Sequence, residues 1–150
     1  MERSIGDILA ARASADPERV AVLWEHGADL RRLTWAELHA VAVRGAHWLL
    51  ERTRPGARVA VWAPNRPAWV ILEYASALAG TVLAPLNPAL VDAECEYLLE
   101  SSQASLLFTV PDSAGRPLLS RADRLASRLP ALIDLIWSPG QRTSPPPPRR

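Results

Sequence analysis

The chain contains no lysine, because all 17 of its basic residues are arginine. A catalytic lysine of any kind is therefore excluded for these 150 residues. The single cysteine, Cys95, excludes an internal disulfide, so a reducing compartment is the default and the cytoplasm is the expected location. No apolar run reaches the roughly 18 residues of a membrane span. The residues after Met1 do not form the continuous apolar core of a secretory signal.

A strong excess of charge is also missing, since the formal net charge is +1. No long-range field therefore selects nucleic acid or an anionic membrane surface as a partner. Glycine is scattered, and neither GxGxxG nor GxxxxGK[ST] occurs. The sequence thus offers no phosphate cradle, and a small Rossmann-like nucleotide binder is the weakest of the hypotheses considered.

Residues that could ligate a metal or act as nucleophiles do not form a recognised motif. His26, His39, His47 and Cys95 give no CxxC, HExxH or paired spacing. The sequence has no GxSxG element. Cys95 falls with Leu98 and Leu99 on the apolar inner face of an expected helix, which favours a buried and inert thiol.

Four carboxylates lie close together in the sequence, at Asp92, Glu94, Glu96 and Glu100. Their spacing predicts a solvated helix face, and nothing pairs two of them as acid and base. Arg121, Arg124 and Arg128 are likewise expected on the wet side of a later helix.

The six tryptophans are better explained by core packing than by binding, with each indole N–H bonded to a neighbouring acceptor. Trp62 has an alternative interpretation, because ligands in open α/β sheets bind beyond the carboxyl ends of strands. The loop Ala63–Arg66 has the same predicted position. We favour a simpler role for this loop, in which Asn65 caps the following helix.

The run Arg58–Leu90 is the core of the expected fold. Apolar residues from Val59 to Ala63 predict a strand buried on both faces. Trp69–Ala79 predicts a buried helix, and Thr81–Leu86 a second strand. Together these segments predict one βαβ unit with parallel strands.

Further helices and strands are predicted on both sides of this unit. Ser4 with Asp7 and Thr34 with Glu37 have the spacing of capping boxes. The expected helices are Ile5–Ala15, Trp35–Glu51, Asp92–Ser102 and Leu118–Leu129. The expected strands are Val20–Trp24 and Leu30–Leu33, paired as a hairpin, and Leu106–Val110 and Ala131–Trp137. The fold class is therefore α/β, with a mostly parallel sheet, βαβ crossovers and a short N-terminal hairpin.

The composition changes at Ser138, where a Pro- and Arg-rich segment begins. We expect residues 1–137 to be folded and residues 138–150 to form a disordered tail. Pro145–Pro148 favours polyproline II. A ligand for SH3 or WW domains is the alternative interpretation of the tail.

Many short segments, in order, resemble the N-terminal part of the AMP-forming acyl-CoA synthetases, members of the adenylate-forming AMP-dependent synthetase/ligase superfamily. The resemblance covers about residues 4–110 and extends more loosely to 137. The matching segments are Ile5–Leu9, Asp16–Ala21, Leu33–Leu38, Arg54–Ala60, Pro64–Trp69, Ala77–Gly80, Pro85–Leu90 and Glu96–Leu99.

The resemblance implies a ligase that uses ATP, Mg²⁺ and CoA to convert a carboxylate, in our interpretation a fatty acid, into an acyl-adenylate and then a CoA thioester. The family's phosphate loop, ribose-binding acidic residue and lid lysine would follow residue 150. We therefore expect no catalytic, cofactor-binding or metal-binding residue within this chain, and no activity of the chain alone. The alternative is a non-catalytic module that pairs with a complementary synthetase fragment, or with itself, through an exposed apolar edge.

Overall fold

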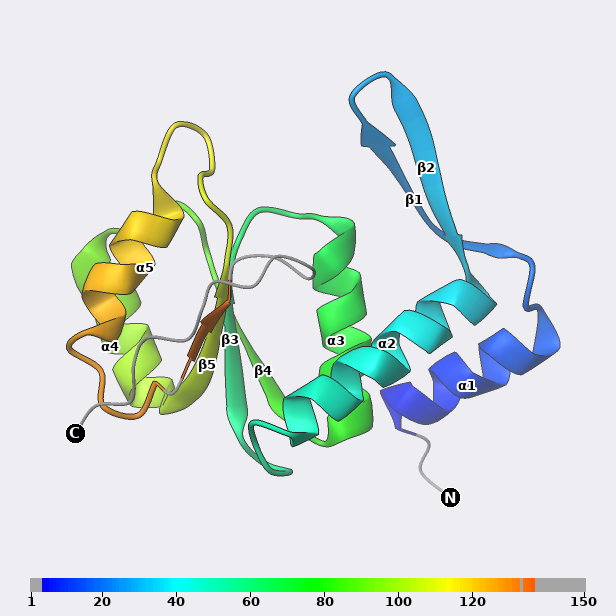
Figure 1. Ribbon diagram of the computed structural model, residues 1–150, viewed down its shortest axis with the longest axis horizontal. Coiled ribbons are helices and arrows are strands. Elements are labelled where there is room, and N and C mark those ends of the chain that lie inside the picture. Colours follow the sequence, from blue (N-terminus) through cyan, green and yellow to red (C-terminus); the bar gives the residue numbers. More distant parts are fainter. Residues whose placement is uncertain (1–3, 133, 137–150) are drawn as a thin grey trace. The chain divides into compact units, whose positions relative to one another are not determined.

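A computed structural model describes residues 4–132 and 134–136 as alternating helices and strands (Figure 1). Contacts within the chain divide it into two compact units. The first unit comprises the residues up to Gly56 together with Asn65–Val82. The second comprises Ala57–Pro64 together with the residues from Leu83 onward. None of the helices in the described part of the chain is long and apolar enough to cross a membrane.

The first unit contains three helices and a hairpin. These are α1 (Ile5–Ala15), β1 (Val20–His26), β2 (Asp29–Thr34), α2 (Trp35–Leu50) and α3 (Pro67–Ala79). Leu9, Leu38 and Ala42 form its buried centre. Apolar side chains of α1, α2, α3 and both strands pack around these three residues. Further residues of α2 and α3 are also buried, among them Leu49, Leu72 and Ala75.

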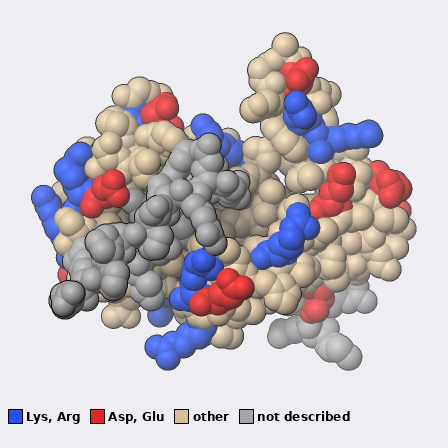
Figure 2. Space-filling model, viewed as in Figure 1, with Lys and Arg blue, Asp and Glu red and all other residues tan. Residues whose placement is uncertain are grey.

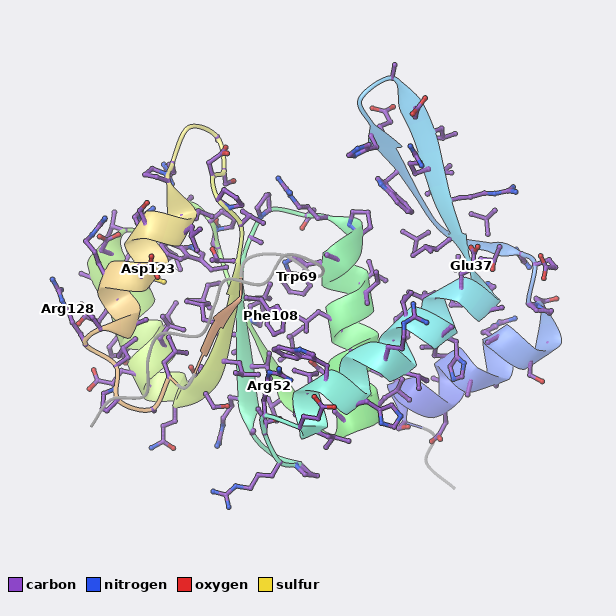
Figure 3. The ribbon with its side chains drawn as sticks, in the orientation of Figure 1. Glu37, Arg52, Trp69, Phe108, Asp123 and Arg128 are labelled. Atoms are coloured by element: carbon purple, nitrogen blue, oxygen red, sulfur yellow. The ribbon has the colours of Figure 1, made fainter. Side chains whose placement is uncertain are left out.

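Both predicted capping boxes are confirmed. The Ser4 hydroxyl accepts from the Asp7 amide at 3.1 Å, and the Asp7 carboxylate accepts from the Ser4 amide at 2.9 Å. Thr34 and Glu37 make the same exchange at 3.2 and 2.8 Å, at the start of α2 (Figure 3). Each box satisfies two amides that the helix leaves without partners, which explains why both helices begin where the sequence predicts.

The hairpin is antiparallel, as expected, but its strands are longer than predicted. His26 pairs with Asp29, so the connection consists of Gly27 and Ala28 alone. Gly27 has a φ of 63°, which a glycine adopts without strain. Glu25, His26 and Asp29, which lie between the two predicted strands, therefore belong to the strands and not to the turn.

The beginning of α3 differs from the prediction. Arg66, not Asn65, is the N-cap residue, and it makes no side-chain capping bond. Pro67 follows at the first helical position, where its fixed φ suits the helix and its missing N–H costs nothing. The residue before a proline is restricted to extended backbone, and Arg66 has φ −146° and ψ 157°. Proline therefore sets this helix start, and the Asn65 side chain is not needed for it.

The second unit contains a four-stranded sheet in the order β4-β3-β5-β6. Its strands are β3 (Arg58–Trp62), β4 (Val82–Leu86), β5 (Ala104–Thr109) and β6 (Asp134–Ile136). β5 is parallel to both β3 and β6. The predicted α/β class and the parallel pairing are confirmed. The position of Trp137 and the predicted tail lie outside the described residues.

Helices α4 (Asp92–Ser102) and α5 (Leu118–Ala126) cover one face of this sheet (Figure 1). The core between them contains Ala60, Trp62 and Leu107 from the strands. Cys95 and Leu99 enter it from α4. Leu118, Ala122 and Leu125 enter it from α5. In β3, the four residues after Arg58 are all buried, as expected for a strand with apolar side chains on both faces.

Candidate functional site

Trp62 lies at the carboxyl end of β3, where a ligand crevice is one of the two expected possibilities. Its side chain is fully buried, with 0% exposed surface. The indole Nε1–H donates to the carbonyl of Asn87 at 3.0 Å, and the hydroxyl of Thr109 donates to the Trp62 carbonyl at 3.0 Å. The structure therefore places Trp62 in the core, where its indole N–H is bonded to the loop after β4.

Arg121 covers the ring of Trp62 and connects three segments of the second unit. Its guanidinium carbon lies 4.7 Å from the centre of the indole ring, a cation–π distance. Nε donates to Oδ1 of Asp92 at 2.5 Å, and one terminal nitrogen donates to the Leu90 carbonyl at 2.7 Å. We call Arg121, Asp92, the Leu90 carbonyl and the Trp62 ring the Arg121 cluster.

The Arg121 cluster corrects one prediction and adds an ion pair to another. Arg121 was expected on the wet side of α5, but its side chain is only 13% exposed. Asp92 is 43% exposed, as expected for a solvated face, but it also pairs with Arg121 and accepts from Arg124 at 3.4 Å, which was not predicted. The physical reason is pairing across elements: the Arg121 guanidinium donates both to the Asp92 carboxylate and to the carbonyl of Leu90 in the loop before α4.

The other carboxylates of α4 have separate partners or face water. Glu94 accepts from the Val91 amide at 3.0 Å and so closes the first turn of the helix. Glu96 pairs at 3.4 Å with Arg128, which lies just past α5 (Figure 3). Glu100 is exposed, as predicted. Structural pairing thus accounts for three of the four acidic side chains.

The pKa of Asp92 is lowered, first by its hydrogen bond from Arg121 and then by the charges of Arg121 and Arg124, against an opposing effect of burial. The carboxylate therefore stabilises the fold above the ordinary aspartate pKa of about 3.9, and this contribution is lost as the pH falls through the lower folded-state pKa.

Because the Asp92 side chain is 43% exposed, we expect this contribution to be about 1 kcal/mol or less. Replacing Asp92 with asparagine should flatten the acid side of the stability profile below about pH 5. Urea unfolding at a series of pH values measures this. Asp112→Asn, in the exposed loop after β5, is the matched control, and an equal flattening in both variants would contradict the assignment.

Cys95 is fully buried in the second unit. Burial raises the pKa of its thiol to about 12. The thiolate, which is the reactive form of cysteine, is therefore scarce at neutral pH, and access is closed as well. The structure supports the expected inert thiol.

We expect alkylation of Cys95 by iodoacetamide to be at least ~100-fold slower in the native chain than in the unfolded chain, because the reagent must wait for local opening. Mass spectrometry of quenched time points measures the rate. Rapid labelling of the native chain would contradict the buried position.

The histidines lie at the end of β1 (His26) and on α2 (His39 and His47). Among the described residues, no group of three or more His, Cys, Asp or Glu side chains could hold a metal ion. Arginine and acidic side chains are interspersed on the visible face of the molecule, without a patch of one sign (Figure 2). On this face, the described charges therefore do not build a surface of one sign.

The outer side of α4 carries a shallow open groove of about 440 Å³. Leu98 was expected on the inner face of α4, but it is 39% exposed and lies in this groove. The reason for this difference is helix geometry. Cys95 and Leu99 already fill the narrow stripe of α4 that faces the core, and Leu98 lies outside that stripe. The residues that line the groove are Leu90, Ala93, Glu94, Tyr97 and Leu98.

Comparisons with known proteins place these features in a family. Residues 9–144 match the family model of the AMP-binding enzymes. The mitochondrial medium-chain acyl-CoA ligase ACSF2 of Rattus norvegicus is 37% identical over 100 residues, which are 66% of this chain and 16% of the relative. Feruloyl-CoA synthase of an Amycolatopsis species is 37% identical over 130 residues, which are 86% of this chain and 26% of the relative.

Solved structures agree with the sequence matches. The N-terminal domain of FACL13 from Mycobacterium tuberculosis superposes with a TM-score of 0.81 at 27% identity, over 91% of this chain and 34% of that one. A putative long-chain-fatty-acid CoA ligase from Rhodopseudomonas palustris gives a TM-score of 0.80 at 24% identity, over 96% of this chain and 34% of that one, which supports the fold alone. The chain spans about a quarter or less of the length of these curated relatives. It belongs to the AMP-binding enzyme family of adenylate-forming acyl-CoA synthetases and has part of the fold of their N-terminal domain.

Proposed function

We propose that this chain is a scaffold segment of an enzyme that activates a carboxylate with ATP and transfers the acyl group to CoA. The observation that carries the proposal is the family match over residues 9–144. The names of the relatives, a medium-chain acyl-CoA ligase and a feruloyl-CoA synthase, support carboxylate activation followed by thioester formation. A fatty acid is the substrate class that we favour.

Within the proposed enzyme, the described residues hold structure and do not react. ATP, Mg²⁺ and CoA would supply the adenylate chemistry, but the residues present do not fit these groups. The sequence has no lysine. Arg121, the cation of the Arg121 cluster, is 13% exposed and already paired with Asp92. No step of the reaction is therefore assigned to a side chain of this chain.

Pyrophosphate release by the purified 150-residue chain tests the scaffold role. With ATP, Mg²⁺, CoA and a panel of fatty and aromatic acids, we expect no release above the rate without enzyme. Feruloyl-CoA synthase, assayed in parallel with ferulate, serves as the positive control. Acyl-dependent pyrophosphate release by the chain alone would overturn the proposal that it carries no chemistry.

A second candidate function is a non-catalytic module that pairs with a partner synthetase or with itself. The exposed apolar side chains of α4 favour it. Sedimentation of the purified chain separates the candidates. A stable dimer, or stoichiometric binding to an intact synthetase, supports the module, whereas a monomer that binds no intact enzyme supports the scaffold segment.

A further inference from the structure

The segment that joins β4 to α4, residues 87–91, is anchored by side chains from three other parts of the second unit. We call it the β4–α4 loop. The donors lie 25 to 31 residues away in the sequence, and each bonds a different carbonyl of the loop. The three bonds run from Nε1 of Trp62 to the Asn87 carbonyl at 3.0 Å, from Arg116 to the Pro88 carbonyl at 3.4 Å and from Arg121 to the Leu90 carbonyl at 2.7 Å.

The amides of the β4–α4 loop are bonded as well. Ala89 donates to Oδ1 of Asn87 at 2.8 Å, and the Leu90 amide donates to the Asn87 carbonyl at 3.1 Å. The Val91 amide donates to the Glu94 carboxylate at 3.0 Å. Each amide from 89 to 91 therefore has a partner within the loop or in the first turn of α4. With carbonyls and amides both bonded, the loop is held in one defined conformation.

Two of the three donors place the loop at the carboxyl edge of the sheet. Trp62 is the last residue of β3, and Arg116 lies in the segment that follows the carboxyl end of β5. Because β3 and β5 are parallel, both carboxyl ends lie at the same edge. Ligands of open α/β sheets bind in the crevice outside the carboxyl ends of the strands. Loops that a rigid scaffold positions are also where binding residues are most frequent.

The chemistry of the loop restricts which part of a substrate it can contact. Its sequence, Asn-Pro-Ala-Leu-Val, contains no ionisable side chain. A polyphosphate needs cations or free amides, but the amides from 89 to 91 are already bonded and Arg121 is paired with Asp92. The loop therefore suits an uncharged, largely apolar part of a substrate. The acyl group of the acid and the pantetheine arm of CoA both have this chemistry.

We infer that the β4–α4 loop forms one wall of the substrate crevice of the acyl-CoA ligase, and that Arg121 and Trp62 are positioning residues for this wall. The inference rests on the proposed function and adds to the scaffold role, because it gives one loop of this chain a part in substrate binding. Neither side chain touches the substrate. Each acts through the loop carbonyl that it holds, so its loss weakens binding and leaves the reacting groups in place.

Steady-state kinetics of a hybrid enzyme test this role. In the hybrid, the residues of this chain replace the matching 130 residues of feruloyl-CoA synthase. Arg121→Met keeps the apolar stem and removes the donors to Leu90 and Asp92. Trp62→Phe removes the bond to the Asn87 carbonyl. Arg124→Met is the matched control, because Arg124 also pairs with Asp92 and makes no bond to the loop.

We expect Arg121→Met and Trp62→Phe to raise the KM of the same substrate, ferulate or CoA, by about fivefold, the effect of one lost hydrogen bond. The substrate affected shows whether the loop contacts the acyl group or the pantetheine arm. The kcat and the KM for ATP should stay within about twofold, and Arg124→Met should change neither. Unchanged KM values for ferulate and CoA, a rise for ATP alone, or an equal effect of Arg124→Met would overturn the inference.

Two further measurements separate this inference from the proposed function. A folded hybrid that makes no feruloyl-CoA, but whose calorimetric affinities for ferulate or CoA show the same pattern, would count against the proposed function alone. If the hybrid does not fold, hydrogen exchange of the 150-residue chain tests the positioning role. We expect the amides from 89 to 91 to exchange at least about tenfold faster in Arg121→Met than in Arg124→Met. Equal exchange in the two variants would overturn the positioning role.

Discussion

Replacing Trp62 with alanine is expected to destabilise the second unit by about 3–5 kcal/mol, the range for truncating a buried large aromatic side chain. Trp62 is the largest of the fully buried side chains, and its removal leaves a cavity among Ala60, Leu107 and the helices that cover them. The same change removes the bond from Nε1 to the Asn87 carbonyl and the ring beneath Arg121. Most small domains have only 5–15 kcal/mol of stability in total.

Urea unfolding followed by far-UV circular dichroism measures the Trp62 effect without relying on tryptophan fluorescence. Trp62→Phe keeps most of the apolar volume and loses the indole hydrogen bond, so we expect a smaller loss, about 1–2 kcal/mol. Trp24→Ala, at a half-buried position in the hairpin, is the control for removing a tryptophan. An equal loss for Trp62→Ala and Trp24→Ala would contradict the central position of Trp62.

The second large effect is expected at Gly45, where α2 packs against α3 in the first unit. A Cβ atom added at Gly45 would lie 2.9 Å from the Cβ atom of Ala75, closer than side-chain carbons pack. Replacing Gly45 with leucine should therefore cost about 1–3 kcal/mol through overpacking. The helix propensity gained on losing glycine, about 0.5–1 kcal/mol, offsets only part of this cost.

A double-mutant cycle tests the Gly45 contact directly. Gly45→Ala should be destabilising or neutral, and adding Ala75→Gly should restore the space, so the pair is expected to be more stable than the sum of the single changes by at least about 0.5 kcal/mol. Gly56→Ala is not a suitable control, because its φ of 84° strains any side chain. Ala36→Gly, in the first turn of α2, measures how much the helix propensity of alanine over glycine contributes to stability. Strict additivity would show that α2 and α3 do not approach closely at this point.

The elements predicted most accurately are those that local hydrogen bonds determine. Helix α1 and helix α4 have the predicted bounds, and both capping boxes are present. α5 ends at Ala126, three residues before the predicted end, because Leu129 is buried without continuing the helix. Differences of this size are expected where tertiary packing, and not a cap, ends an element.

The Arg121 cluster could be predicted only in part. Leu118, Arg121 and Leu125 have the i, i+3, i+7 spacing of one helix face, which places Arg121 beside the buried stripe of α5. That spacing alone indicates a half-buried arginine. Its partner Asp92 is 29 residues away in the sequence, so the ion pair depends on how α4 and α5 pack. The exposure of Leu98 could not be predicted for the same reason. The apolar spacing along α4 does not determine which of its apolar side chains fit into the core.

A hybrid in which the residues of this chain replace the matching 130 residues of feruloyl-CoA synthase tests the scaffold role most directly. If the matched residues supply structure and no chemistry, the hybrid should still form feruloyl-CoA from ferulate, ATP and CoA. We expect a rate within about tenfold of the parent enzyme, which corresponds to about 1.4 kcal/mol in the transition-state free energy. A hybrid that folds cooperatively but forms neither the acyl-adenylate nor the thioester would contradict the account.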